Sequence, residues 1–291
     1  WRMVLLALWG IFDLLFYNGD ILLVYAACSL FVIPLIRQSN KVLFAAAIFF
    51  ALQPIELVYI VLGLLNPELT PLYLGSNEDF GAIMPQQING SFFDVAWVSL
   101  KHGIPVNFTW AIENGRFTQT IFLFIAGILL GRYRYLYDEG NNRLHWKKTM
   151  LYSLIGFAVF YPLYTYVPDT IDNVCVSHSL GIMLKAWMNL SMMLFYVSGI
   201  TWLYHCTKPG KKLIAVAPYG KMSLTNYMTQ SIFGAMLFYG WGFGLYQYCG
   251  HTLSLLLGIA FVGLQYLFCR WWLKSHKRGP FEELWRKATW I

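Results

Sequence analysis

Residues 251–274 read HTLSLLLGIAFVGLQYLFCRWWLK, and no charged side chain precedes Arg270 in this stretch. A helix that crosses a bilayer needs about 20 mostly apolar residues, which this stretch supplies. It lacks the alternation of apolar and polar residues that is typical of a membrane-spanning β-strand. We therefore expect residues 251–274 to form a transmembrane helix.

The composition of the whole chain also favours a membrane environment. Of its 291 residues, 58% are hydrophobic and 12% are charged, and the mean hydropathy is +0.52. Soluble domains are typically about 25% charged and about 45–50% apolar. Aromatic residues make up 18% of the chain, which excludes a disordered protein because disordered chains contain few of them.

Eight segments are apolar enough to be predicted as spans. They are residues 2–17, 21–37, 41–65, 117–135, 148–167, 179–206, 218–241 and 251–274. The first two are joined by a short turn at residues 18–20 and are expected to form a helical hairpin. The predicted fold is an all-α, polytopic transmembrane helix bundle over residues 1–274, followed by a cytoplasmic tail over residues 275–291.

The loops between these segments differ in charge. Eighteen of the 21 Lys and Arg residues fall on one side of the predicted membrane, and Lys101, Arg116 and Lys185 fall on the other. Cytoplasmic loops are enriched in Lys and Arg, so the basic side and the C-terminus are predicted to be cytoplasmic. This topology accounts for the net charge of +7, and no element carries a basic stripe, so nucleic-acid binding is not expected.

Two segments outside the predicted spans have structure of their own. Residues 66–116 are predicted to be an outer lid loop, with a short re-entrant or interfacial helix at residues 91–100. In the tail, apolar residues recur on one helical face, which predicts an amphipathic helix lying in the membrane interface. These residues are Phe281, Leu284, Trp285 and Ala288.

Cysteine and histidine give little indication of chemistry. Only Cys175 and Cys249 are predicted to lie on the outer side, and their spacing leaves open whether they form a disulfide. No Cys/His cluster has the spacing of metal ligands, so no metal is expected. The chain begins Trp-Arg-Met without a signal peptide, and we expect it to start partway through a longer protein.

Polar side chains occur inside the predicted spans, where ionisable groups are costly and often functional. Asp13, Glu56 and Lys185 are ionisable, and Glu56 follows a predicted kink at Pro54. A polar stripe at helical spacing is formed by Ser223, Asn226, Tyr227 and Gln230. Such groups act either as interhelical contacts, worth about 0.6 kcal/mol each, or as a site. For the ionisable residues both interpretations stay open.

The sequence contains no P-loop, no HExxH motif and no GxSxG nucleophile elbow. Any catalysis would therefore be general acid–base chemistry by Asp, Glu or His near the outer face, and otherwise the site only binds.

Four blocks of the sequence resemble one family. They read GDILLVYA at residues 19–26, PYGKMSLTNYMTQS at 218–231, FYGWGFGLY at 238–246 and RGPFEELWR at 278–286. Their order and content are similar to those of the YeiB-like family of bacterial multipass membrane proteins. The resemblance covers nearly the whole chain. Family members generally carry one or two further N-terminal spans with an Arg-Gly-Phe motif, and often a His where this chain has Gly10-Ile-Phe-Asp13.

The resemblance implies a bacterial cytoplasmic (inner) membrane protein, with the lipid bilayer as its surroundings. The family is distantly similar to membrane acyltransferases that modify envelope sugars or glycans, with an acyl donor such as acetyl-CoA. By that similarity Asp13 and Asp20 are candidate catalytic residues, Asp13 standing in for the family's His. The substrate-binding candidates are Glu56, Arg116, Lys185, Asn226 and Gln230.

Two other functions stay open on the sequence alone. The first is a carrier of a small solute or a lipid-linked molecule. Transporters often contain helices that are broken near the midplane of the membrane, and Pro54 and Pro162 provide candidate breaks. Against that function, the two halves show no repeated motif. A non-catalytic partner subunit would require no cavity within the bundle. The oligomeric state is not indicated by the sequence.

Overall fold

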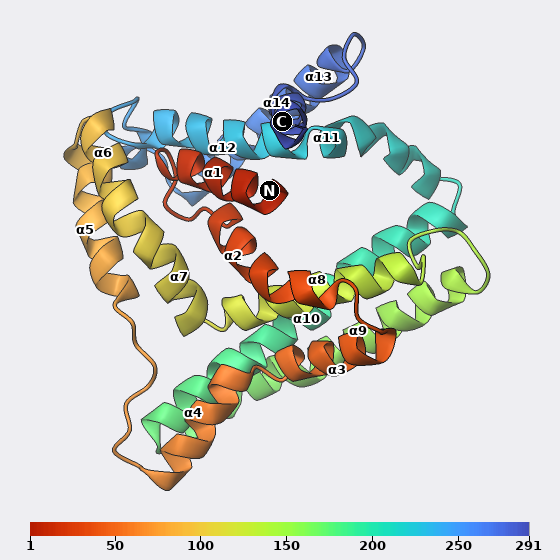
Figure 1. The fold of residues 1–291 in the computed structure, drawn as a ribbon. Helices are drawn as coiled ribbons and strands as arrows, with labels where there is room; N and C mark the ends of the chain where they lie inside the picture. Colours follow the sequence, from red (N-terminus) through yellow and green to blue (C-terminus); the bar gives the residue numbers. More distant parts are fainter. Residues whose placement is uncertain (291) are drawn as a thin grey trace. The chain divides into compact units, whose positions relative to one another are not determined.

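The computed structural model describes residues 1–290, and these residues form helices and turns without a β-strand (Figure 1). This confirms the all-α class. The chain divides into two compact units. Unit 1 comprises residues 1–26, 75–108 and the described residues from 213 onward. Unit 2 comprises residues 27–74 and 109–212.

Unit 1 is built mainly around helix α12 and the helices that contact it. Its helices are α1 (Arg2–Leu14), α5 (Ser76–Asn89), α6 (Phe92–Val98), α11 (Ala217–Lys221), α12 (Ser223–Phe238), α13 (His251–Trp272) and α14 (Pro280–Thr289). Helix α12 contacts α1 and α14, and α11 contacts both α12 and α13. Helices α2 (Leu22–Val32) and α7 (Ile104–Glu113) begin in this unit and end in unit 2.

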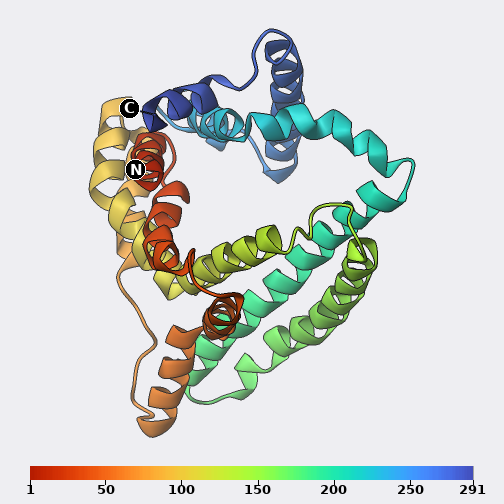
Figure 2. The ribbon, with the colours of Figure 1, turned by 45° about the vertical axis from the view of Figure 1, so that its right-hand side comes forward.

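Unit 2 is organised by its longest helix, α10. Its helices are α3 (Asn40–Ala51), α4 (Pro54–Leu65), α8 (Arg116–Arg132), α9 (Asn142–Tyr166) and α10 (Val174–Cys206). Helix α9 runs beside α10, and α4 packs against α10 as well (Figures 1 and 2). Helix α3 packs against α8.

The number of spans is smaller than the sequence predicts. Three helical stretches are long and apolar enough to cross a membrane: residues 142–170, α10 and α13. The bent pair α3 and α4 raises the number to four if it forms one span. The prediction of eight spans is not supported, because α1 has 13 residues, α12 has 16 and α8 has 17. At about 1.5 Å per residue, such helices are shorter than a hydrocarbon core about 30 Å thick.

The break between α3 and α4 lies next to Pro54, where the sequence predicts a kink. The two helices are bent by 49°. Gln53 adopts a left-handed conformation with φ 56°, and Pro54 begins α4, where its missing N–H is not needed. The Trp187 indole N–H donates to the Ala51 carbonyl at 2.7 Å, and so satisfies one carbonyl at the end of α3.

The predicted loop at residues 66–116 is more helical than expected. It contains α5, α6 and α7, with a π-helical turn at Ser99–Gly103 between the last two. Helix α6 falls within the expected stretch 91–100 and begins with a capping box formed by Ser91 and Asp94. The short helix predicted at residues 91–100 is therefore present, and α5 and α7 are further helices that were not predicted from the sequence.

The C-terminal helix α14 is present where the tail was predicted to be helical. Its Phe281 ring meets Trp9 edge-on at 5.2 Å, and the Trp1 indole donates to the Ala288 carbonyl at 2.8 Å. Glu282 accepts the Thr225 N–H at 2.9 Å. The tail helix therefore contacts α1 and α12 through Phe281 and Glu282, whereas Leu284 on its apolar face remains 54% exposed.

Candidate functional site

The candidate residues from the sequence fall into two groups, one in each unit. Unit 1 contains Asp13, Asp20, Asn226 and Gln230, and unit 2 contains Glu56, Arg116 and Lys185. Each group is described within its own unit.

Asp20 is 1% exposed and is held by two donors. Its Oδ1 accepts the Tyr227 hydroxyl at 2.9 Å, and its Oδ2 accepts the Leu23 N–H at 3.1 Å. Helix α1 approaches this carboxyl at Gly10, where an added Cβ would lie 2.7 Å from Asp20 Oδ2 and 2.8 Å from the Leu23 nitrogen. The packing here therefore requires a glycine.

Burial raises the pKa of the Asp20 carboxyl above its ordinary value, because the charged form loses its hydration. The hydrogen bonds from the following backbone N–H groups and from Tyr227 act in the opposite direction. Desolvation is the larger effect, so this carboxyl holds a proton more tightly than an exposed aspartate does.

Asp13 lies at the end of α1 and is fully buried. Its Oδ2 accepts the Ser231 hydroxyl at 2.9 Å, and its Oδ1 is buried without a hydrogen-bond partner among the described residues. An unpartnered buried oxygen costs about 1–3 kcal/mol, and more for a charged group. The structure thus leaves one oxygen of Asp13 ready to accept a proton or a hydrogen bond.

A cavity of about 330 Å³ lies on one face of α12. Tyr227 and Ser231 are four residues apart and therefore share this face. The lining residues are Tyr17, Tyr227, Gln230, Ser231, Gly234, Ala235, Phe238 and Tyr239. Four hydroxyl-bearing side chains thus line the cavity, and two of them, Tyr227 and Ser231, each donate to a buried carboxylate. We call Asp13, Asp20, Tyr227 and Ser231 the hydroxyl–carboxylate site.

The two predicted amides differ in position. Gln230 lines the cavity, and its Nε2 donates to the Tyr219 hydroxyl at 2.9 Å and to Gln265 Oε1 at 3.0 Å. Asn226 is not among the lining residues; its Nδ2 donates to the Tyr219 carbonyl, and its Oδ1 accepts from the Cys269 thiol. Asn226 therefore acts as a packing contact between α12 and its neighbours.

Ser231 was not predicted as a site residue, and Tyr227 was predicted only as a member of the polar stripe. Ser231 lies eight residues after Ser223, so the same helical spacing that defines the stripe extends to it. Its partner Asp13 lies 218 residues away in the chain, and no local pattern predicts that pairing.

Glu56 lies in the first turn of α4 and is 3% exposed. Its Oε2 is buried without a hydrogen-bond partner among the described residues. Gly115, with φ +64°, lies against it, and a Cβ at that position would be 2.8 Å from the Ile182 side chain and 3.1 Å from Glu56 Oε1. Glu56 is not among the residues lining the large pocket of unit 2.

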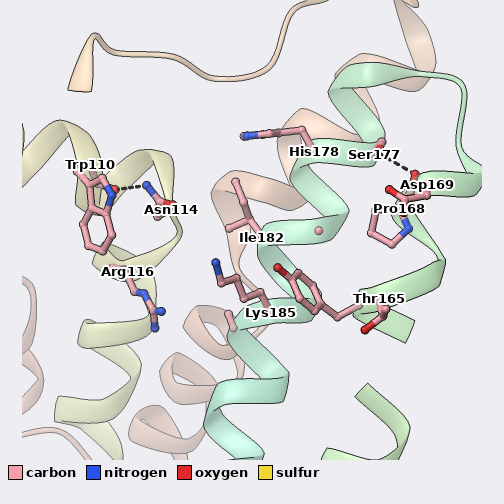
Figure 3. A pocket seen from close by; sticks show the side chains of 13 residues that line it. Trp110, Asn114, Arg116, Thr165, Pro168, Asp169, Ser177, His178, Ile182 and Lys185 are labelled. Carbon is pink, nitrogen blue, oxygen red and sulfur yellow. Dashed lines mark hydrogen bonds between the residues drawn. The ribbon is translucent and has the colours of Figure 1, made fainter. Parts of the chain in front are cut away.

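That pocket has a volume of about 500 Å³ and brings Arg116 and Lys185 together. Lys185 and His178 extend from α10 toward Trp110 in α7, Asn114 in the following turn and Arg116 at the start of α8 (Figure 3). We call Arg116, His178 and Lys185, with the pocket they line, the cationic pocket. Two of its members were predicted as binding residues, and His178 was missed although it precedes Lys185 by seven residues, two helical turns.

The side chains that could ligate a metal or form a disulfide are dispersed among residues 1–290. No group of three or more His, Cys, Asp or Glu side chains is placed to hold a metal ion. The five cysteines are free thiols, and Cys175 belongs to unit 2 whereas Cys249 belongs to unit 1. The chemistry that the arrangement offers is proton transfer at the hydroxyl–carboxylate site and anion binding at the cationic pocket.

The fold and these sites define a helical protein with several apolar helices, and comparison with known proteins places it in a family. Residues 130–291 match the family described as "Protein of unknown function (DUF418)", and the chain belongs to that family. It is 27% identical to the uncharacterized protein YxaH of Bacillus subtilis, over all of this chain and 71% of that protein. It is also 27% identical to the uncharacterized protein YeiB of Escherichia coli, over 99% of this chain and 74% of that protein.

The resemblance to YeiB-like proteins is therefore confirmed. A further relative, an uncharacterized 39.9 kDa protein of Bacillus acidopullulyticus, is 25% identical over 99% of this chain and 70% of its own length. No solved structure matches the chain.

Proposed function

We propose that this protein is a membrane enzyme that transfers an acyl group to a hydroxyl of an envelope sugar or glycan at the hydroxyl–carboxylate site. The observation that carries the proposal is the pair of cavity-lining hydroxyls, each backed by a buried carboxylate. Interhelical contacts need only neutral partners, whereas buried carboxylates are costly and mark functional sites in membranes.

The geometry assigns a role to each side chain. An acceptor hydroxyl in the cavity reaches Ser231 Oγ, which separates the cavity from Asp13. As the acceptor oxygen bonds to the acyl carbon of a thioester, its proton passes to Ser231 while Ser231 gives its own proton to Asp13 Oδ2. The C–S bond breaks, and the thiolate leaves with the proton that Asp13 returns. General-base catalysis of this kind contributes about 10²–10⁴-fold.

Tyr227 and Asp20 position the acceptor sugar in the cavity and do not take up its proton. The Tyr227 hydroxyl donates to Asp20 and accepts the Ile21 N–H at 3.3 Å, which leaves its oxygen one further lone pair to accept a hydrogen bond from a sugar hydroxyl. The rest of the wall is largely apolar or aromatic, with Ala235 and Phe238, which suits an acyl chain or a sugar face.

The test is transfer of labelled acetyl groups from acetyl-CoA to envelope glycans in membranes that contain the protein. Asp13→Asn is expected to lower the rate by about 10²-fold or more. The matched control is Asp138→Asn, which removes an exposed carboxylate that pairs with Arg143. Equal transfer by the wild type and folded Asp13→Asn would show that this carboxylate is not the base.

The bent pair α3 and α4 favours a second candidate function, a carrier of a small anionic solute. Broken helices that bring helix ends and polar groups to one place are typical of transporter sites. Glu56 at the break has an unpartnered Oε2, and the cationic pocket belongs to the same unit. Uptake of an anion into proteoliposomes, without acyl transfer, would favour this function over the enzyme.

We also propose that the protein resides in the bacterial inner membrane with its C-terminus in the cytoplasm. The support is the presence of three or four apolar helices and the one-sided distribution of Lys and Arg. The test is labelling of Cys206, an exposed thiol at the end of α10, in intact cells with a thiol reagent that does not cross membranes. The proposal predicts labelling only after the cells are opened.

A further inference from the structure

We infer that the cationic pocket binds the phosphate group of a phosphorylated organic molecule. This pocket is a different cavity from the hydroxyl–carboxylate site, so the inference does not depend on whether the protein transfers acyl groups. Three nitrogen-bearing side chains, Arg116, His178 and Lys185, line one pocket in unit 2 (Figure 3).

The charges of this pocket are not neutralised by the protein. Neither Arg116 nor Lys185 forms an ion pair with a carboxylate among residues 1–290, where the ion pairs involve other side chains. Arg116 donates from Nη1 to Gln119 Oε1 at 2.8 Å, and an arginine has five N–H groups. Donors therefore remain for a ligand.

The one acidic residue that lines the pocket is Asp169. In Figure 3 it lies beside Pro168, on the side of the pocket opposite Arg116. A ligand held by Arg116 and Lys185 thus meets two cations, and Asp169 is left to accept hydrogen bonds from hydroxyl groups of the same ligand. This separation favours an anion that also carries neutral polar groups.

The arrangement favours phosphate over a single carboxylate. Arginine forms paired hydrogen bonds to two phosphate oxygens, and lysine adds a point charge that suits a dianion. Asn114 lines the pocket with a carboxamide, of which Nδ2 donates to the Trp110 carbonyl at 3.0 Å. Helix α8 begins at Arg116, and the positive end of its dipole adds to the attraction.

The pocket is larger than a phosphate alone requires. Its volume of about 500 Å³ lies in the range of sites for organic ligands, about 300–1,000 Å³. The rings of Trp110 and Tyr164 line the remaining space and offer faces for a sugar or another flat group. A phosphate ester therefore fits the charges and the space together.

The test uses the full chain in detergent and measures how fast an amine-reactive acetylating reagent modifies Lys185, by peptide mass spectrometry. Lys185 is exposed, and Lys101 in unit 1, also exposed, serves as the internal reference. Inorganic pyrophosphate, at constant ionic strength, is expected to slow modification of Lys185 about tenfold at about ten times its dissociation constant, and to leave Lys101 unchanged.

Variants assign the protection to the pocket. Arg116→Gln is expected to abolish it, whereas Lys41→Gln, an equal loss of charge at an exposed position outside the pocket, is expected to retain it. His178→Asn provides a second pocket variant with the same Lys185 readout if Arg116→Gln does not fold.

Two probes separate the sources of the phosphate. Protection by pyrophosphate supports a soluble phosphate ester. Protection only by phosphatidylcholine vesicles that contain phosphatidic acid supports a lipid headgroup. The inference is overturned if neither probe protects Lys185, if Lys101 is protected equally, or if acetate at the same ionic strength protects as well as pyrophosphate does.

Discussion

The hydroxyl–carboxylate site of unit 1 and the cationic pocket of unit 2 hold opposite charges in opposite surroundings. Asp13 and Asp20 are withdrawn from solvent behind hydroxyl groups that bond to them. Lys185 and His178 are exposed at the wall of a large pocket. A buried charge depends on its partners, whereas an exposed charge is already hydrated.

This difference separates stability from function in the two regions. Substitutions at the hydroxyl–carboxylate site are expected to change both the free energy of unfolding and any activity. Substitutions of Lys185 or His178 in the cationic pocket are expected to change binding alone, because these side chains are exposed. Variants matched in chemistry but placed in different units therefore test the comparison directly.

The largest effect is expected for Asp20→Ala. The substitution removes the acceptor of the Tyr227 hydroxyl and of the Leu23 N–H. Each buried donor left without a partner costs about 1–3 kcal/mol, so the free energy of unfolding should fall by about 2–6 kcal/mol. Unfolding of the detergent-solubilised protein, followed by circular dichroism, measures this loss. The matched variant Asp138→Ala, at an exposed ion pair, should lose little, and equal losses would contradict the comparison.

A smaller loss is expected for Gly10→Ala. The new Cβ would lie 2.7 Å from Asp20 Oδ2 and 2.8 Å from the Leu23 backbone nitrogen, which is fixed at the start of α2. Overpacking of this kind typically costs about 1–3 kcal/mol. The control is Gly127→Ala in α8, where an added Cβ meets nothing within 4 Å. The same unfolding measurement applies, and an unchanged Gly10→Ala transition would mean that α1 can move away from Asp20.

The helices show which parts of the fold can be predicted from the sequence and which cannot. The long apolar helices α10 and α13 were predicted within a few residues of their ends, apart from the start of α10, because unbroken hydropathy is a local property. The break beside Pro54 was predicted because a proline interrupts helical hydrogen bonding, which is also a local property. By contrast, hydropathy alone does not show where a helix ends, so the short apolar helices α1, α8 and α12 were predicted as spans and the number of spans was overestimated.

The site was predicted only in part, and the reason is distance along the chain. Asp13 and Asp20 were identified as costly groups, and Arg116 and Lys185 as candidates for binding. Which of them share a cavity depends on contacts such as that between Asp13 and Ser231, which are 218 residues apart. The single set of site residues expected from the sequence is instead divided between two units.

The contrast between the units is sharpened by Glu56→Gln, for which little loss of stability is expected. Glu56 is as buried as Asp20, yet its Oε2 has no hydrogen-bond partner among the described residues. An amide of the same shape is cheaper to bury than a carboxylate, so the free energy of unfolding should stay within about 1 kcal/mol of the wild type or rise. Asp20→Asn is the matched variant in unit 1 and should be destabilised, because its amide group cannot accept at both oxygen positions.

The smallest effect on stability is expected for Lys185→Gln. This variant should weaken ligand binding in the cationic pocket of unit 2 without changing the activity of the hydroxyl–carboxylate site in unit 1. Lys185 is exposed and has no ion-pair partner among residues 1–290, so the unfolding transition should not shift measurably. Binding of pyrophosphate, measured by calorimetry, should weaken because one of the two permanent cations of the pocket is removed. Acyl transfer in membranes should be retained if it takes place in unit 1. Loss of acyl transfer with intact folding would instead make the cationic pocket part of the catalytic machinery, and the separation of stability from function between the two units would no longer hold.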